Sequence, residues 1–239
     1  LREDFSNVKS PAGERRLGFF FTAPPPVMIY QPKDAFYRRA KEEGYRSRAA
    51  YKLLELNRRF HLIRPGDLVV DLGAAPGGWL QVASQLAGKK GRVLGVDIQP
   101  IEPVAEENVL ILQGDVTSEE CQERIMEILG SRADCVLSDL SPRLSGIRYA
   151  DVSRSSELVR SALQIASRLL RPGGNFLVKT FVGEELNALS LELKGHFRSL
   201  KRTRPESTRK GSSEIYLCAQ GLQKQGRHSP PAEGRQKSP

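Results

Sequence analysis

One stretch of the sequence decides the fold: Val69-Val70-Asp71-Leu72-Gly73-Ala74-Ala75-Pro76-Gly77-Gly78-Trp79. An apolar run that ends in a carboxylate and glycines predicts a buried parallel strand turning sharply into a helix, here from about Trp79 to Leu86. Glycine permits positive φ angles and close approach of the backbone to a ligand. The N-terminal amides of the helix are directed at the same place. The stretch therefore predicts a small-molecule site.

Two common ligands of such glycine loops fit poorly. A phosphate-binding GxxxxGK[ST] loop needs a lysine and a hydroxyl after its last glycine, where Trp79 and Leu80 stand. A dinucleotide-binding GxGxxG loop needs closer glycines, but Gly73 is followed by Ala74-Ala75-Pro76. The remaining candidate ligand of the glycine loop is a nucleoside without phosphates.

Acidic residues end the neighbouring predicted strands. Asp97 ends the strand 92–97, where an acid that binds ribose hydroxyls is expected. Asp115 ends the strand 109–115 and could accept a hydrogen bond from an adenine amino group. Together with Asp71 and Asp139, these acids favour S-adenosylmethionine, a cationic sulfonium, over an anionic dinucleotide.

Five motifs carry a family resemblance. DLGAAPGGW (71–79) is preceded by YRSRAAYKL (45–53) and followed by SDLSP (138–142), LVKTF (177–181) and SSEIYL (212–217). In this order, from about Ala35 to Leu222, the sequence resembles the FtsJ/RrmJ family of ribosomal RNA large-subunit 2′-O-methyltransferases.

The resemblance implies a fold, a cofactor and a site. The fold would be the α/β, Rossmann-like fold of S-adenosylmethionine-dependent methyltransferases, with a mostly parallel seven-stranded sheet and one antiparallel strand. The substrate would be a uridine of large-subunit (23S) ribosomal RNA. The implied catalytic residues are Lys52, Asp139, Lys179 and Glu214. The implied cofactor-binding residues are Gly73, Gly77, Gly78, Trp79, Asp97, Asp115 and Asp139.

The four catalytic candidates suit methyl transfer to a ribose. A 2′-hydroxyl is a weak nucleophile until its proton is leaving, and a nearby amine or ammonium can help. Lys179 would either accept that proton or orient the hydroxyl, while Asp139 and Glu214 would hold the lysines in place. The attack of the hydroxyl on the methyl group is an in-line displacement, so the positioning of the two reactants should supply much of the rate acceleration.

Helix and strand patterns alternate along the rest of the chain, which predicts a doubly wound sheet closing in a hairpin. Arg171-Pro172-Gly173-Gly174 is typical of a turn, and Ser47 is placed to cap a helix. The other helices are expected near 119–129, 153–170 and 184–197, and the other strands near 134–139, 175–181, 198–204 and 214–220.

Composition points to an anionic partner. The net charge is +9 and the pI about 9.6. Arginines alternate with tyrosines between Arg38 and Arg59, and further basic residues stand at Lys201, Arg202, Arg204, Arg209 and Lys210. We expect these segments to bind RNA. Three separated cysteines suit reduced thiols, three scattered histidines predict no metal site, and no apolar run has membrane-spanning length. A cytoplasmic monomer is the corresponding expectation.

Three regions follow from these patterns. Residues 28–222 are expected to form the methyltransferase domain. Residues 1–27 are predicted to be a disordered or non-native extension, and residues 223–239 a disordered basic tail. Two alternatives to ribosomal RNA methylation remain: tRNA 2′-O-methylation, and an RNA-binding ribosome-assembly factor with a non-catalytic S-adenosylmethionine pocket.

Overall fold

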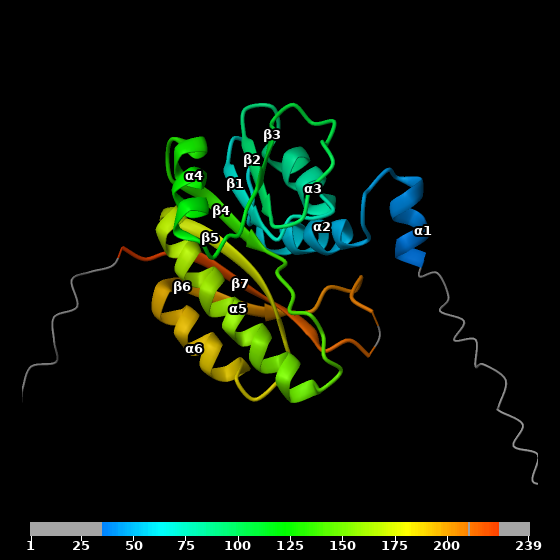
Figure 1. The fold of residues 1–239 in the computed structure, drawn as a ribbon, viewed down its shortest axis with the longest axis vertical. Helices are drawn as coiled ribbons and strands as arrows, with labels where there is room; N and C mark the ends of the chain where they lie inside the picture. Colours follow the sequence, from blue (N-terminus) through cyan, green and yellow to red (C-terminus); the bar gives the residue numbers. More distant parts are fainter. Residues whose placement is uncertain (1–34, 210, 225–239) are drawn as a thin grey trace, which may run out of the picture. The chain divides into compact units, whose positions relative to one another are not determined.

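In the computed structural model, which describes residues 35–209 and 211–224, seven strands form one sheet in the order β3-β2-β1-β4-β5-β7-β6 (Figure 1). The strands are β1 (Leu68–Leu72), β2 (Arg92–Asp97), β3 (Val109–Gln113), β4 (Ala133–Ser138), β5 (Leu170–Phe181), β6 (Phe197–Thr203) and β7 (Glu214–Leu222). The helices are α1 (Ala35–Glu42), α2 (Ala49–Phe60), α3 (Gly78–Ala87), α4 (Glu119–Leu129), α5 (Arg148–Leu169) and α6 (Leu186–His196).

The sheet has the predicted topology. The pairs β1–β2, β2–β3, β1–β4 and β4–β5 are parallel, whereas β7 runs antiparallel to both β5 and β6. The chain moves from β1 outward to β2 and β3, and then returns to the other side of β1 with β4. Ligands of parallel α/β sheets bind at such a switch point, outside the carboxyl ends of the strands.

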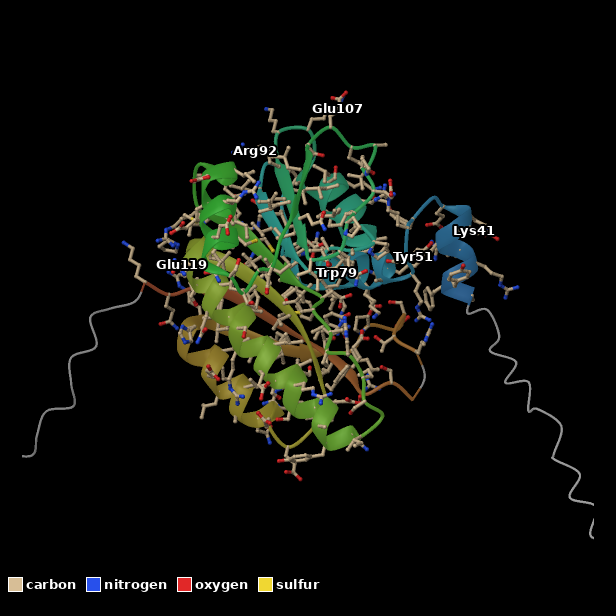
Figure 2. The ribbon with its side chains drawn as sticks, viewed as in Figure 1. Lys41, Tyr51, Trp79, Arg92, Glu107 and Glu119 are labelled. Atoms are coloured by element: carbon tan, nitrogen blue, oxygen red, sulfur yellow. The ribbon has the colours of Figure 1, made fainter. Side chains whose placement is uncertain are left out.

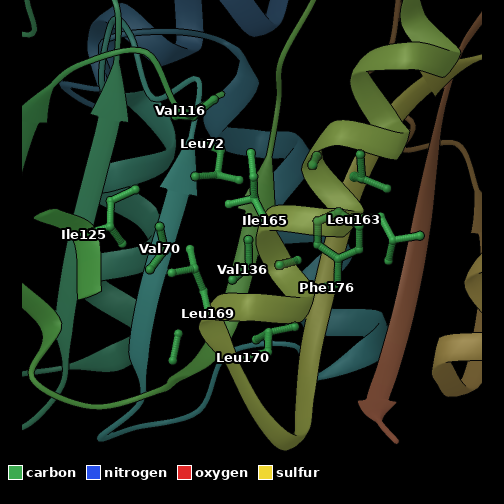
Figure 3. Packing of buried hydrophobic residues seen from close by; sticks show 14 of the residues in the cluster. Val70, Leu72, Val116, Ile125, Val136, Leu163, Ile165, Leu169, Leu170 and Phe176 are labelled. Atoms are coloured by element: carbon green, nitrogen blue, oxygen red, sulfur yellow. The ribbon is translucent and has the colours of Figure 1, made fainter. Parts of the chain in front are cut away.

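Alternating side chains of the strands build a hydrophobic core on each face of the sheet. Val69, Val93 and Leu137 belong to the core that α2 and α3 cover. Val70, Leu94 and Val136 belong to the opposite core, to which α4, α5 and α6 contribute (Figure 3). The glycine loop after β1 thus leads into α3 on one face, while the segment after β4 leads into α5 on the other.

Three local predictions were wrong. Residues 171–174 are part of β5 and make no separate turn, because α5 passes directly into a strand whose Leu170 already pairs with Ala133. The pairing is irregular there, and Gly173 takes a φ of +83°. Ser47 does not cap α2: the N-cap residue is Arg48, whose side chain makes no capping hydrogen bond to the first turn of the helix. Strand β3 ends at Gln113, so Asp115 lies two residues beyond it.

Other predictions concern parts of the chain at its ends. The extension 1–27 and the tail 223–239, except Gln223 and Lys224, lie outside the described residues. Among the residues that are described, no helix is both long enough and apolar enough to cross a membrane.

The three cysteines are buried and form no disulfide: Cys121 lies on the buried side of α4, Cys135 on β4 and Cys218 on β7. Burial raises the pKa of the Cys218 thiol to about 12 and that of Cys135 well above its ordinary value. Because the thiolate is the reactive form, the native protein should react very slowly with a thiol reagent at neutral pH. The same reagent should titrate all three thiols in guanidinium chloride. Fast reaction of the native protein would contradict the burial of these side chains.

Candidate active site

Strand register brings the candidate catalytic residues together. Ser138 of β4 pairs with Val178 of β5, which sets Asp139 beside Lys179. In the antiparallel pair, Lys179 lies opposite Tyr216 and Phe181 opposite Glu214. Residues two apart on a strand share a face, so Glu214 and Tyr216 project to the same side, and α2 brings Lys52 to them.

Lys179 and Asp139 form a buried ion pair. The Lys179 ammonium lies 2.9 Å from Asp139 Oδ1 and donates to the Asp139 carbonyl oxygen at 2.7 Å. Only 8% of the Lys179 side chain is exposed. An ammonium has three donors, so one remains for another oxygen.

Lys52 and Glu214 form a second pair, which joins α2 to the start of β7. Their Nζ and Oε1 atoms are 2.5 Å apart, and both side chains are largely buried. Burial would raise the pKa of Glu214, but the charge and hydrogen bond of Lys52, the Tyr216 hydroxyl and the more distant Lys179 together hold it below its ordinary value. Glu214 therefore carries a negative charge at neutral pH.

Tyr216 connects the two pairs, although it is not among the site residues predicted from the sequence. Its hydroxyl donates to Asp139 Oδ1 at 3.1 Å, and the Lys52 ammonium lies 5.7 Å from its ring centroid. Burial, followed by the charges of Asp139 and Glu214, raises its pKa well above the ordinary value. Its position two residues after Glu214 in an expected strand was the available signal, because that spacing places both side chains on one face.

The glycine loop follows the predicted strand-to-helix geometry. Gly73 and Gly77 have φ angles of +80° and +106°, and Gly77 is the N-cap of α3. A Cβ on Gly78 would lie 2.3 Å from Ser47 Oγ, so glycine there permits close packing of the turn before α2. No side chain caps α3, and its first amides remain for a ligand.

Trp79 differs from the expectation of a cofactor contact. Trp79 lies inside the protein (Figure 2), and the residue is 3% exposed. Its indole N–H donates to the Ala49 carbonyl at 2.8 Å, and its ring centroid is 6.0 Å from that of Tyr216. The side chain therefore fixes α3 to the helix that carries Lys52. Only its backbone amide, in the first turn of α3, remains near the loop.

Asp97 and Asp115 both shape backbone turns. Asp97 accepts from the amides of Ala75 and Gln99 at 3.0 and 2.8 Å, one on each carboxylate oxygen. Asp115 Oδ1 accepts from the amide and hydroxyl of Thr117, which lower the pKa of Asp115. A carboxylate has about four acceptor positions, so each residue keeps acceptors for a nucleoside.

Two arginines of the predicted RNA-binding segment are engaged inside the protein. The Arg46 guanidinium donates to the Pro76 carbonyl at 3.2 Å and to the carbonyls of Glu102 and Pro103. Arg48 donates to the Ser207 carbonyl. Arg46 thus ties the glycine loop to the loop after β2, and its loss would disturb the cofactor side of the site. Lys210 lies outside the described residues.

The comparisons with known proteins agree with this geometry. Residues 45–222 match the model of the FtsJ-like methyltransferase family. The chain belongs to this family. "Ribosomal RNA large subunit methyltransferase E" of Methanothrix thermoacetophila is 53% identical over 195 residues, covering 82% of this chain and 75% of the relative. The protein of the same name from Archaeoglobus fulgidus is 50% identical over 192 residues, which cover 80% of this chain and 97% of the relative.

A solved structure extends the likeness to three dimensions. The crystal structure of a Plasmodium falciparum protein, described as a ribosomal RNA methyltransferase, superposes with a TM-score of 0.67. It is 30% identical and covers 74% of this chain and 98% of its own. This FtsJ-like protein is therefore a methyltransferase with the Rossmann-like fold, as its sequence predicted.

S-adenosylmethionine is the methyl donor of this FtsJ-like protein, and Asp71 gives a structural reason for the fit. Asp71 is the residue before the end of β1, and its fully buried carboxylate has no hydrogen-bond partner among the described residues. Burial, followed by the charges of Asp139 and Asp97, raises its pKa well above the ordinary 3.8. Three acids that repel one another are stabilised by a cationic ligand. Asp71 was noticed in the sequence only as one of the strand-end acids.

No metal is suggested by the same acids. Within residues 35–209 and 211–224, no three or more His, Cys, Asp or Glu side chains are grouped so that they could hold a metal ion.

Asp71→Asn should make the ligand-free protein more stable, increasingly so as the pH rises above the ordinary pKa of 3.8 toward the raised pKa of the folded state. The raised folded pKa of Asp71 means that its contribution to stability is present below 3.8 and is lost as the pH rises toward the folded pKa. Asparagine has no charge to bury, so the difference in unfolding free energy should grow by up to about 1.4 kcal/mol per pH unit. Denaturant titrations at several pH values measure it. A constant difference would contradict a protonated, buried Asp71.

Proposed function

We propose that this FtsJ-like protein transfers the methyl group of S-adenosylmethionine to the ribose 2′-hydroxyl of a uridine in large-subunit ribosomal RNA. The observation that carries the proposal is the pair of buried lysine–carboxylate contacts, Lys179–Asp139 and Lys52–Glu214, at the carboxyl edge of the sheet. The relatives named as ribosomal RNA large-subunit methyltransferases support ribosomal RNA as the substrate rather than tRNA.

Lys179 is the proposed contact for the ribose. Its ammonium has one donor left after binding Asp139, and a donor to the 2′-oxygen would hold the lone pair of that oxygen in line with the methyl group. S-adenosylmethionine would supply an activated methyl group: its methyl–sulfur bond would break as the new C–O bond forms, S-adenosylhomocysteine would leave, and the hydroxyl proton would pass to solvent water. The protein then contributes mainly position and electrostatics, which can lower a barrier by several kcal/mol.

Asp139 is the group that keeps Lys179 in place. It accepts from both Lys179 and Tyr216, so its carboxylate cannot swing away without breaking two contacts. We assign Tyr216 as a positioning residue, because its hydroxyl binds Asp139 and its ring lies under the Lys52 ammonium.

Lys52 and Glu214 close the opposite side of the site. Their contact crosses from α2 to β7, so it depends on the packing of α2 against the sheet. We propose that Lys52 binds the ribose or the neighbouring phosphate of the target nucleotide, and that Glu214 orients the Lys52 side chain.

The monomeric state and the cytoplasmic location of the protein, both expected from the sequence, stay predictions.

Cofactor binding can be tested at Asp97. Asp97→Asn removes the charge but keeps an acceptor for the Ala75 amide, so affinity for S-adenosylmethionine should fall about tenfold, near 1.4 kcal/mol. The exposed Glu107, which projects from the loop before β3 (Figure 2), supplies the matched control Glu107→Gln. Isothermal titration calorimetry measures both. Equal affinities for the two variants would remove Asp97 from the cofactor site.

Methyl transfer can be tested at Lys179. Lys179→Ala should lower kcat by about 10²- to 10⁴-fold, while S-adenosylmethionine binds as in the parent. The assay follows transfer of a labelled methyl group to deproteinised large-subunit RNA and maps the product by its resistance to alkaline cleavage at a 2′-O-methyl site. Lys194→Ala, on the exposed face of α6, is the control. A Lys179→Ala variant with parental turnover would refute the assignment, and methylation of a base would refute the ribose as acceptor.

A further inference from the structure

The segment between β4 and the first turn of α5 exposes an unusual set of side chains. It reads Arg143-Leu144-Ser145-Gly146-Ile147-Arg148-Tyr149. Leu144, Ile147 and Tyr149 are 67%, 65% and 76% exposed, and both arginines are exposed as well. Three large apolar side chains exposed together with two cations on one short segment are costly to leave in water. The arrangement indicates a partner that carries negative charge for the arginines and a flat ring that can stack on Tyr149.

The cations of this segment are available, unlike those first expected to bind RNA. Across the described part of the chain, neither Arg143 nor Arg148 has a hydrogen bond or ion pair. Arg46 and Arg48, in contrast, donate to backbone carbonyls within the protein. A guanidinium that already binds a carbonyl has fewer donors for a phosphate. The segment 143–149 therefore offers contacts that the turn before α2 does not.

Asp151 holds this segment in one shape despite its exposure. Its Oδ1 accepts from the amide and hydroxyl of Ser145 at 2.7 and 2.8 Å, and its Oδ2 accepts from the Gly146 amide at 3.2 Å. These hydrogen bonds lower the pKa of Asp151, so the carboxylate stays charged at neutral pH. Side chains on a fixed backbone lose less freedom when they bind a ligand.

Both ends of the segment are attached to the catalytic strands. It begins after Asp139, where Leu140 packs on Gly73. At its other end, α5 lies against β5: Val152 packs on Gly183, and the hydroxyls of Ser155 and Thr180 are 3.4 Å apart. Figure 1 shows the chain running from β4 to the first turn of α5. α5 and α2 pack on opposite faces of the sheet, and the chain that leads to this segment leaves β4 beside Lys179, at the carboxyl edge of the sheet.

We propose that the segment 143–149 is an RNA-binding platform for the unpaired nucleotides next to the methylated ribose. Arg143 and Arg148 bind phosphates of the strand, and Tyr149, supported by Leu144 and Ile147, stacks on a neighbouring base. Single-stranded RNA presents both groups, because its bases are free to stack while its backbone remains anionic. The inference rests on the proposed function in one respect only, that the acceptor is RNA.

Binding measurements with the full chain test the platform. The probes are a fluorescent single-stranded RNA and deproteinised large-subunit RNA, each titrated at several salt concentrations. Arg143→Ala with Arg148→Ala should reduce the slope of log affinity against log salt by about 1.4, because each lost phosphate contact on a single strand contributes about 0.7. Tyr149→Ala should weaken binding about tenfold with an unchanged slope, whereas Tyr149→Phe should bind as the parent does.

Matched controls come from exposed residues on other helices. Arg124→Ala on α4 and Leu191→Ala on α6 remove similar side chains and should leave RNA affinity unchanged. All platform variants should bind S-adenosylmethionine normally, and they should raise the KM for RNA while kcat stays parental. If the platform variants bound RNA like the controls, or if Tyr149→Phe lost as much affinity as Tyr149→Ala, the proposed phosphate or stacking contacts would be wrong.

The same experiment separates this inference from the proposed function. RNA affinity is measured without methyl transfer, so a parent that binds RNA through residues 143–149 but does not methylate it would overturn only the proposed function. A parent that methylates RNA with platform variants equal to it in KM would overturn only the platform.

Discussion

A buried ammonium must be paired, and this constraint on Lys179 governs the edge of the sheet where the proposed catalytic residues lie. Its partner Asp139 follows β4, Lys179 lies on β5, and the tyrosine that also binds Asp139 lies on β7. A slip of β5 by one residue against its neighbouring strands would move Lys179 to the opposite face of the sheet. The charge would then be buried among apolar side chains, a state that costs several kcal/mol. The register of β5 in the sheet and the ion pair between Lys179 and Asp139 therefore depend on each other.

The sequence predicted the parts of the fold that depend on pattern. Helix α4 has the predicted bounds, and the alternation of strands and helices predicted the sheet and its reversed strand. Because strand ends gather at one edge of a parallel sheet, the sequence also predicted that Asp139 and Lys179 would lie at the same edge; Lys52 and Glu214 were expected there from the family resemblance. Tyr216 was missed because a tyrosine in an apolar strand is more often a core residue than part of a polar network.

Sequence reasoning failed where tertiary contacts override local preference. A proline followed by two glycines after a helix usually marks a turn, but pairing of Leu170 with Ala133 extends β5 through it. The role of Arg46 could not be predicted either, since its acceptors are the carbonyls of two loops distant in sequence. An arginine in a basic segment gives no indication whether it faces solvent or the protein.

The contact of Trp79 with α2 has a consequence for spectroscopy. It is the one tryptophan in the sequence, and its ring nitrogen binds the carbonyl of Ala49 at the first residue of the helix that carries Lys52. Selective excitation of this indole reports on a single place in the molecule, the junction of α2, α3 and the reversed strand. Undocking of α2 would wet the ring and shift its emission to the red. The protein thus contains a natural optical reporter for the assembly of its catalytic edge.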